Sequence, residues 1–123
     1  MLGFLSVLLA AACVASPSHP ANSFSPYGTG PAFGSGPVWA IGSWKQVGTN
    51  KQKFLWIVSP RLPSELYIDV DGGRFSGGTR RIDGVTRARW RDQPSTVIVT
   101  HPGCLRFHIG GPNGFARTIT VAA

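Results

Sequence analysis

The sequence predicts an all-β fold, built as a single antiparallel sandwich, and three observations support this prediction. Glycine (16) and proline (10) are frequent in the 123 residues and separate short apolar segments. Those segments alternate or are continuously apolar, as strands are, and none has the apolar spacing of a helix. The chain is also long enough for one domain with a real core. We expect about eight or nine short strands in residues 37–123, with a small barrel as the competing architecture.

The first two strands are expected at residues 37–44 (PVWAIGSW) and 53–59 (KFLWIVS). The second is apolar on both faces, which is typical of a strand in the middle of a sandwich. Pro60 and Pro63 end it, because proline cannot donate a hydrogen bond to a sheet. Its expected faces are Phe54, Trp56 and Val58 on one side, and Leu55 and Ile57 on the other.

The middle of the chain is expected to form hairpins, because two Asp-Gly pairs follow strand-like segments. A type I′ turn needs positive φ at both central positions, and Asp-Gly suits it. In residues 65–70 (ELYIDV) every second residue is apolar, which points Leu66, Ile68 and Val70 to one side. The strands and turns expected here are residues 65–70, the turn Asp71-Gly72, residues 79–83, the turn Asp83-Gly84 and residues 86–90.

The last three expected strands are residues 95–100, 104–109 and 115–121. In CLRFHI, residues 104–109, the alternation predicts apolar residues inward and polar residues outward. The same reasoning predicts that Trp56 and Trp90 lie in the core. The inward residues are Leu105, Phe107 and Ile109, and the outward residues are Cys104, Arg106 and His108.

Residues 1–15 have the features of a secretory leader. The apolar run of residues 2–15 contains no charge and is shorter than the about 20 residues that a membrane-spanning helix needs. Small residues follow the run, as at a signal-peptidase site. No Lys or Arg precedes it, so either the leader is atypical or the true start lies upstream of Met1. Residues 16–36, rich in Ser, Pro and Gly, are expected to be a flexible tether before the domain of residues 37–123.

Cys13 stands where the leader meets the tether, and three fates are open to it. Residues 9–13 (LAAAC) resemble a bacterial lipobox, in which the cysteine receives diacylglycerol, although Ala10 replaces the usual leucine. We favour this reading, with Cys13 as a lipid anchor, over ordinary cleavage after a small residue that leaves Cys13 unmodified. A Cys13–Cys104 disulfide is the third alternative, and we favour it less because a mobile arm closes such a loop poorly.

Four short motifs, PVWAIG, KFLWIVSP, RRIDG and HPGC, in this order resemble a group of uncharacterised bacterial secreted proteins and lipoproteins. The final stretch, HPGCLRFHIGGPNGFARTITV, is similar to the last hairpin of many bacterial Ig-like domains. There, Pro-Gly leads into an alternating strand, and a Gly-rich turn precedes the final strand. The resemblance covers residues 37–123. It implies a leader, a Pro-rich tether and one Ig-like sandwich, and it implies no known activity or catalytic residue.

The chain is basic, with 12 Lys and Arg against five Asp and Glu and a formal net charge of +7. Such an excess attracts anionic partners over long range. Period-two spacing predicts that Arg87, Arg89 and Arg91 share one face of a strand, where they either bind anionic groups or keep an edge strand soluble. Trp44 follows a Gly-Ser break and is the tryptophan we expect to be exposed. The candidate binding surface is Arg80, Arg81, Arg87, Arg89, Arg91 and Trp44.

Two other constellations fall short of a site. Cys104 and His108 are about 13 Å apart along one strand, which is too far for both to hold one metal. His101 can approach Cys104 across the Pro-Gly turn, but a Cys–His nucleophile pair also needs an orienting group and an oxyanion site, and the sequence indicates neither. Residues 69–73 (DVDGG) begin like a calcium loop, but the twelfth position, where an EF-hand has glutamate, is Arg80. We therefore expect no metal and no cofactor.

Together these features favour a non-catalytic protein, in the cell envelope or freely secreted, with a basic sandwich surface for an anionic polymer or a protein partner. Its contact with the membrane would run through a lipid on Cys13. Nucleic acid is disfavoured as a partner by the secretory leader. The first alternative is a carbohydrate-binding module that uses exposed tryptophans, and the lower one is a hydrolase that uses Cys104 or a histidine.

Overall fold

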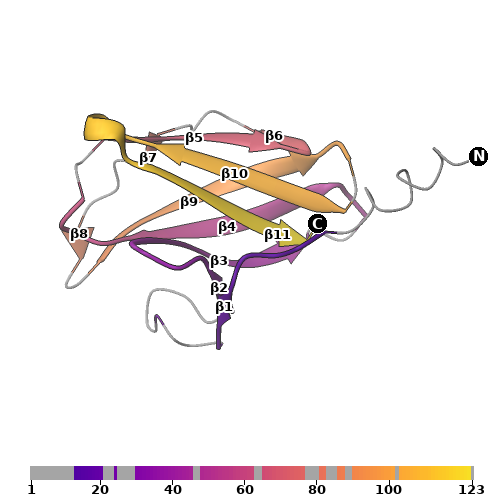
Figure 1. The fold of residues 1–123 in the computed structure, drawn as a ribbon. Helices are drawn as coiled ribbons and strands as arrows, with labels where there is room; N and C mark the ends of the chain where they lie inside the picture. The colour runs from indigo at the N-terminus through magenta and orange to yellow at the C-terminus, as the bar shows by residue number, and fades with distance from the viewer. Residues whose placement is uncertain are drawn as a thin grey trace, which may run out of the picture.

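The computed structural model describes residues 13–20, 24, 30–45, 48–62, 65–76, 81–82, 86–87, 90–101 and 103–122, without the side chains of residues 43–45 and 86–87. In this part of the chain the structure is all-β, with two antiparallel sheets and no α-helix. The sheets form two layers, with β5 and β10 in one and β3 and β4 in the other (Figure 1). The all-β prediction is confirmed.

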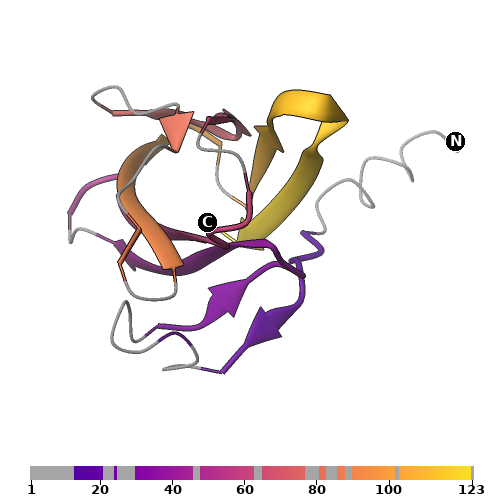
Figure 2. The same cartoon turned by 90° about the vertical axis from the view of Figure 1, so that its left-hand side faces the viewer.

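The larger layer, sheet A, has seven strands in the described part of the chain. Its path is β1-β2-β3-β4-β9-β6, and β8 pairs with β9 as well. Figure 2 shows how β1 and β2 extend this sheet past β3. The strands are β1 (Ser18–His19), β2 (Ala32–Phe33), β3 (Val38–Lys45), β4 (Lys51–Val58), β6 (Gly73–Phe75), β8 (Thr86–Arg87) and β9 (Trp90–Val99).

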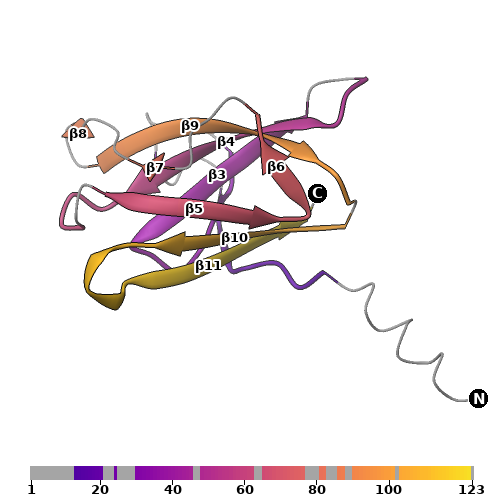
Figure 3. The same cartoon turned by 90° about the horizontal axis from the view of Figure 1, so that it is seen from above.

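Among the described residues, the smaller layer, sheet B, has four strands in the order β11-β10-β5-β7. Seen from above, its strands lie across those of sheet A at an angle (Figure 3). A short 3₁₀ turn, η1 (Pro112–Gly114), joins β10 to β11. The strands are β5 (Leu66–Asp71), β7 (Arg81–Ile82), β10 (Cys104–Gly110) and β11 (Ala116–Ala122).

The main core lies between the two sheets and is centred on aromatic rings. The ring centroid of Phe107 lies 4.9 Å from that of Trp56 and 5.0 Å from that of Phe54. The Trp56 indole N–H donates to the Oγ of Ser95 at 2.7 Å, which satisfies the polar atom of this buried side chain. The other buried residues of this core are Val38, Ala40, Val58, Leu66, Ile68, Ile82, Val97, Leu105, Ile109, Ile119 and Val121.

Strand β4 is central, and its second half, residues 54–58, is covered on both faces, as the sequence predicts. It pairs with β3 on one side and with β9 on the other. Its two sets of alternate residues enter different clusters, one between the sheets and one on the outer face of sheet A. The outer cluster is Ala32, Ile41 and Ile57, with Phe24, Trp39, Leu55 and Trp90 packed against it.

Asp71-Gly72 does not form the predicted hairpin. β5 belongs to sheet B, whereas β6 belongs to sheet A and pairs with β9, so the chain crosses between the layers at Gly72. Gly72 has a φ of +92°, and a Cβ on it would overlap the carbonyl oxygen of Cys104. A Cβ on Gly73 would lie 2.6 Å from the carbonyl oxygen of Ile98. Glycine at both positions therefore allows the crossing chain to contact β10 and β9 closely.

The segment after β6 also differs from the prediction. β7 pairs with β5 and β8 pairs with β9, so the strands expected to flank Asp83-Gly84 belong to different sheets. The turn itself lies outside the described residues. β9 starts well before the expected 95–100 and includes Pro94. In the described part of the chain, the side of β9 away from β4 pairs with β8 at residues 90–91 and with β6 at residues 97–99. Pro94 lies between these two paired stretches, where its missing N–H breaks no described pairing on that side.

Gln52 interrupts the apolar pattern of the core. It lies on the core-facing side of β4 and is only 2 % exposed. Neither its Oε1 nor its Nε2 has a hydrogen-bond partner in the described part of the structure. A buried polar group without a partner costs about 1–3 kcal/mol, so this amide destabilises the fold.

We expect Gln52→Met to raise the free energy of unfolding by about 1 kcal/mol or more, because it keeps the approximate shape and removes both polar atoms. Urea denaturation followed by tryptophan fluorescence measures this change. Gln52→Glu is the matched variant, and it should lower the stability because it places a carboxylate in the same buried position. Equal stability of the Met variant and the wild type would contradict the assignment of an unsatisfied amide.

Candidate functional sites: the disulfide strap and the exposed cations

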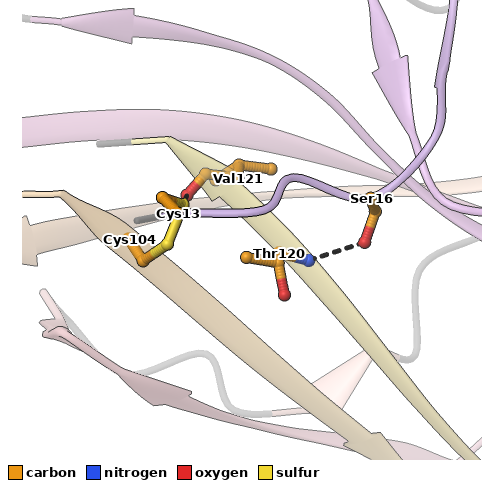
Figure 4. The surroundings of a disulfide bond; sticks show 5 residues. All are labelled: Cys13, Ser16, Cys104, Thr120 and Val121. Atoms are coloured by element: carbon orange, nitrogen blue, oxygen red, sulfur yellow. Dashed lines mark hydrogen bonds between the residues drawn. A yellow bond between two sulfur atoms is a disulfide. The ribbon is translucent and has the colours of Figure 1, made fainter. Parts of the chain in front are cut away.

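The two cysteines of the chain form a disulfide. The Cα atoms of Cys13 and Cys104 are 5.4 Å apart, across a sequence separation of 91 residues. Cys104 is the first residue of β10, and Cys13 lies beside the end of β11, its sulfur 3.8 Å from the carbonyl oxygen of Val121 (Figure 4). The bond therefore ties the segment that follows the expected leader to sheet B.

Residues 13–19 form what we call the strap, which follows the open edge of sheet B. β11 is the edge strand there, and Ser16 binds it twice. The Ser16 backbone N–H donates to the Thr120 carbonyl oxygen at 2.8 Å. The Ser16 Oγ accepts from the Thr120 N–H, also at 2.8 Å, and Figure 4 shows this second bond. An uncovered edge strand is a template for pairing with other chains. The strap occupies part of that edge.

Beyond Ser16 the strap passes to sheet A. The carbonyl oxygen of Pro17 accepts from the Gly34 N–H at 2.8 Å, and His19 Nε2 donates to the Gly34 carbonyl oxygen at 3.2 Å. The segment 16–36, expected to be a flexible tether, thus supplies β1 and β2, and sheet A begins at Ser18 rather than near residue 37. These two-residue strands are held by backbone hydrogen bonds, so no apolar alternation marks them in the sequence.

The disulfide is incompatible with two roles considered for the cysteines. A sulfur atom in a disulfide cannot also carry a thioether-linked lipid, so the lipid anchor expected at Cys13 and this pairing are alternatives. Cys104 has no thiolate in the bond, so a hydrolase that uses Cys104 as its nucleophile is incompatible with the disulfide. His101 contacts Thr100 instead, with 3.1 Å between Nδ1 and Oγ1. The structure contains the Cys13–Cys104 disulfide, which was the less favoured of the alternatives for Cys13.

Arg87 and Arg91 do not lie on one strand, as the predicted arginine row requires. Arg87 of β8 stands opposite Trp90 of β9, so Arg87 and Arg91 lie on different, antiparallel strands. Arg91 is 5 % exposed, and its Nη2 donates to the carbonyl oxygen of Leu62 at 3.3 Å. Its burial lowers the pKa of the guanidinium from the usual value. Arg91 is thus a structural residue near the end of the core, and the expectation that it binds a partner at the surface is corrected.

Arg81 is exposed, as a binding residue should be, but it already has a local partner. Its Nη2 lies 3.0 Å from Oε1 of Glu65, and its guanidinium lies 5.8 Å from the ring centroid of Tyr67. The remaining candidates, Arg80, Arg89 and the side chain of Arg87, lie outside the described part of the structure. The arginine segment therefore supplies no free cation among the described side chains.

The tryptophans outside the main core do not stack in parallel where they are described. Trp39 and Trp90 meet edge to face, with ring centroids 5.3 Å apart and planes at 83°, and Phe24 packs against both rings. Trp90, which we expected in the core, belongs to this outer cluster of sheet A instead. Trp44 of β3 is in register with Lys53 of β4, and its side chain lies outside the described part.

His108 points outward from β10, as predicted, and contacts a carboxylate. Its Nε2 lies 2.8 Å from Oδ2 of Asp71, and its Nδ1 lies 3.5 Å from Oγ1 of Thr118. Among the described residues, no group of three or more His, Cys, Asp and Glu side chains is arranged to hold a metal ion. This part of sheet B is a mixed-charge surface.

Exposed charges are distributed unevenly between the two sheets. Three of the five acidic residues lie on or next to β5 in sheet B. Two of them contact cationic or titratable partners there, Glu65 with Arg81 and Asp71 with His108. Sheet A differs from sheet B, because three of its described side chains are exposed cations on its outer face. They are Lys51 and Lys53 of β4 and Arg74 of β6.

Comparisons with protein-family models, with curated proteins and with solved structures find no match. No helix in the described part of the chain is long and apolar enough to cross a membrane. Function must therefore be inferred from the disulfide, the strap and the charged surfaces of the molecule itself.

Proposed function

We propose that this chain is an exported, non-catalytic binding domain of the cell envelope or the extracellular space. The Cys13–Cys104 disulfide carries this proposal, because disulfides persist in oxidising compartments and are rare in the cytosol. Cys13 follows the apolar leader directly, so cleavage before Cys13 yields a mature chain that keeps both partners of the bond. The leader then ends at or before residue 12, rather than at residue 15.

The two antiparallel layers and the resemblance of residues 37–123 to bacterial secreted proteins support an Ig-like domain. Such sandwiches host many unrelated functions, so the surface decides what this one binds. The net charge of +7 and the exposed cations of sheet A favour an anionic polymer as the partner. With both cysteines paired, the domain is exported without a lipid on Cys13.

The binding proposal is tested with the purified, oxidised chain and fluorescently labelled heparin, a sulfated glycan. We expect binding at 20 mM NaCl that weakens steeply as salt is added, because the attraction is electrostatic. Fluorescence anisotropy gives the Kd at each salt concentration. No binding at the lowest salt would contradict an anionic partner.

A carbohydrate-binding module is the second candidate, favoured by the register that sets Trp44 beside Lys53. An indole next to a cation suits a sugar ring that carries an anionic group. The same assay with neutral cello-oligosaccharides separates the two proposals. If the protein binds the neutral sugar and Trp44→Ala abolishes this binding, ring stacking and not electrostatic attraction is the basis of recognition.

A further inference from the structure

The three exposed cations of sheet A lie on neighbouring positions of one face. Arg74 of β6 is in register with Ile98 of β9, and Ile98 is in register with Lys51 of β4. Lys53 lies two residues further along β4, on the same face. The Cα atoms of Arg74 and Lys51 are thus about 10 Å apart, two strand spacings, and those of Lys51 and Lys53 about 7 Å apart. We call Lys51, Lys53 and Arg74 the basic strip.

The side chains of the basic strip point to solvent and not into the core. Their neighbours of opposite parity, Gln52 and Phe75, face the interior, whereas all three cations are exposed. Among the interactions of the described residues, none engages a side-chain nitrogen of the strip. These cations therefore remain available to an external partner.

No carboxylate on the described strands of sheet A lies beside the strip. The nearest acidic position on the same strands is Asp92 of β9, which is in register with Ile57 and therefore four residues, or about 13 Å along the strand, from Lys53. That distance exceeds a Debye length of about 8 Å at physiological salt, so Asp92 neither neutralises nor screens the strip. The described part of sheet A therefore has no carboxylate next to the strip, and Asp71, three residues before Arg74, contacts His108.

We propose that the basic strip is the binding site for a linear glycan that carries carboxylate or sulfate groups, an inference that rests on the proposed function above. Lysine presents a compact charge on a flexible stem, which adapts to anionic groups repeated along a chain. Between the cations lie Thr96 and Ile98 of β9, half-buried side chains against which sugar rings can pack. The oxidising compartment indicated by the disulfide favours a glycan over nucleic acid.

The test compares two triple variants of the oxidised chain with the same change in net charge. The first removes the strip through Lys51→Gln, Lys53→Gln and Arg74→Gln. The second removes three exposed cations elsewhere, through Arg61→Gln, Arg106→Gln and Arg117→Gln. Both are titrated into labelled heparin, labelled polygalacturonate and a labelled 20-nucleotide single-stranded DNA over a series of NaCl concentrations, with circular dichroism to confirm folding.

We expect the strip variant to bind both glycans at least tenfold more weakly than wild type and to lower the slope of log Kd against log [NaCl] by about 2, since each lost ionic contact lowers this slope by somewhat less than one. The matched variant should lose less than threefold. If the two variants lose glycan affinity equally, the strip is not the binding site, although the partner is still anionic. Tighter binding of DNA than of either glycan would overturn the choice of partner. If wild type binds none of the probes, the proposed function fails together with this inference.

Discussion

Replacing Cys104 with serine is expected to lower the free energy of unfolding by about 3–5 kcal/mol. The Cys13–Cys104 bond closes a loop across 91 residues, and the entropy that such a cross-link removes from the unfolded chain grows with loop length. For a domain of this size the loss corresponds to a fall in Tm of roughly 15 °C. Differential scanning calorimetry of the oxidised wild type and the variant measures both quantities.

Matched variants separate the loss of the bond from the loss of a side chain. Cys13→Ser and the double variant should have the same stability as Cys104→Ser within about 0.5 kcal/mol, because all three lose the same cross-link. A reductant should lower the wild type to this level and leave the variants unchanged. A wild type whose Tm does not respond to reductant would contradict a structural disulfide.

Phe107→Ala is expected to destabilise the domain by about 3–5 kcal/mol, the range found for large-to-small changes of a buried aromatic side chain. Phe107 is fully buried in β10, and its ring contacts Phe54 and Trp56 of sheet A. It therefore joins the two layers, and its loss leaves a cavity between them. Guanidinium unfolding followed by fluorescence measures the effect.

The control is Tyr67→Ala, because Tyr67 is an aromatic residue of the same sheet that is 50 % exposed on the outer side of β5. Its loss should cost about 1 kcal/mol or less. If Phe107→Ala does not fold, Phe107→Leu provides a milder variant, expected at about 1–2 kcal/mol. Equal costs at positions 107 and 67 would show that the core does not lie between the sheets.

The sequence predicted the strands whose side chains alternate or fill both faces. In β10, Leu105, Phe107 and Ile109 are buried and the residues between them are not, as period two requires. In β4, continuous apolarity predicted burial on both faces. These features are local, because one strand's own side chains show which of its faces is covered.

The pairing of strands is harder to predict, because it depends on which other strand lies next to each one and not on the strand's own sequence. Asp71-Gly72 has the residues of a hairpin, yet the chain uses Gly72 and Gly73 to cross from one sheet to the other. The spacing of the arginines at residues 87–91 predicts one strand, whereas Arg87 and Arg91 belong to two. A turn signal shows that the chain changes direction, and it does not show which sheet receives the next strand.

The candidate sites in the structure differ from the predicted ones for the same reason, because they depend on contacts between distant parts of the chain. Cys13 was assigned from its place beside the leader, and its distance from Cys104 exists only in three dimensions. The basic strip was missed, although K-x-K at residues 51–53 already has the spacing of one strand face. Its third member, Arg74, joins through the pairing of β6 with β9, which no local pattern indicates.

The central claim is that an exported mature chain keeps Cys13 and pairs it with Cys104. Mass spectrometry of non-reduced peptides, from protein recovered outside the cytoplasm of an exporting host, tests this claim most directly. The account predicts a cross-linked pair of peptides that contain Cys13 and Cys104, two hydrogens lighter than the sum of the two thiol peptides. A diacylglyceryl group on Cys13, two free thiols, or a mature chain that starts after residue 13 would contradict it.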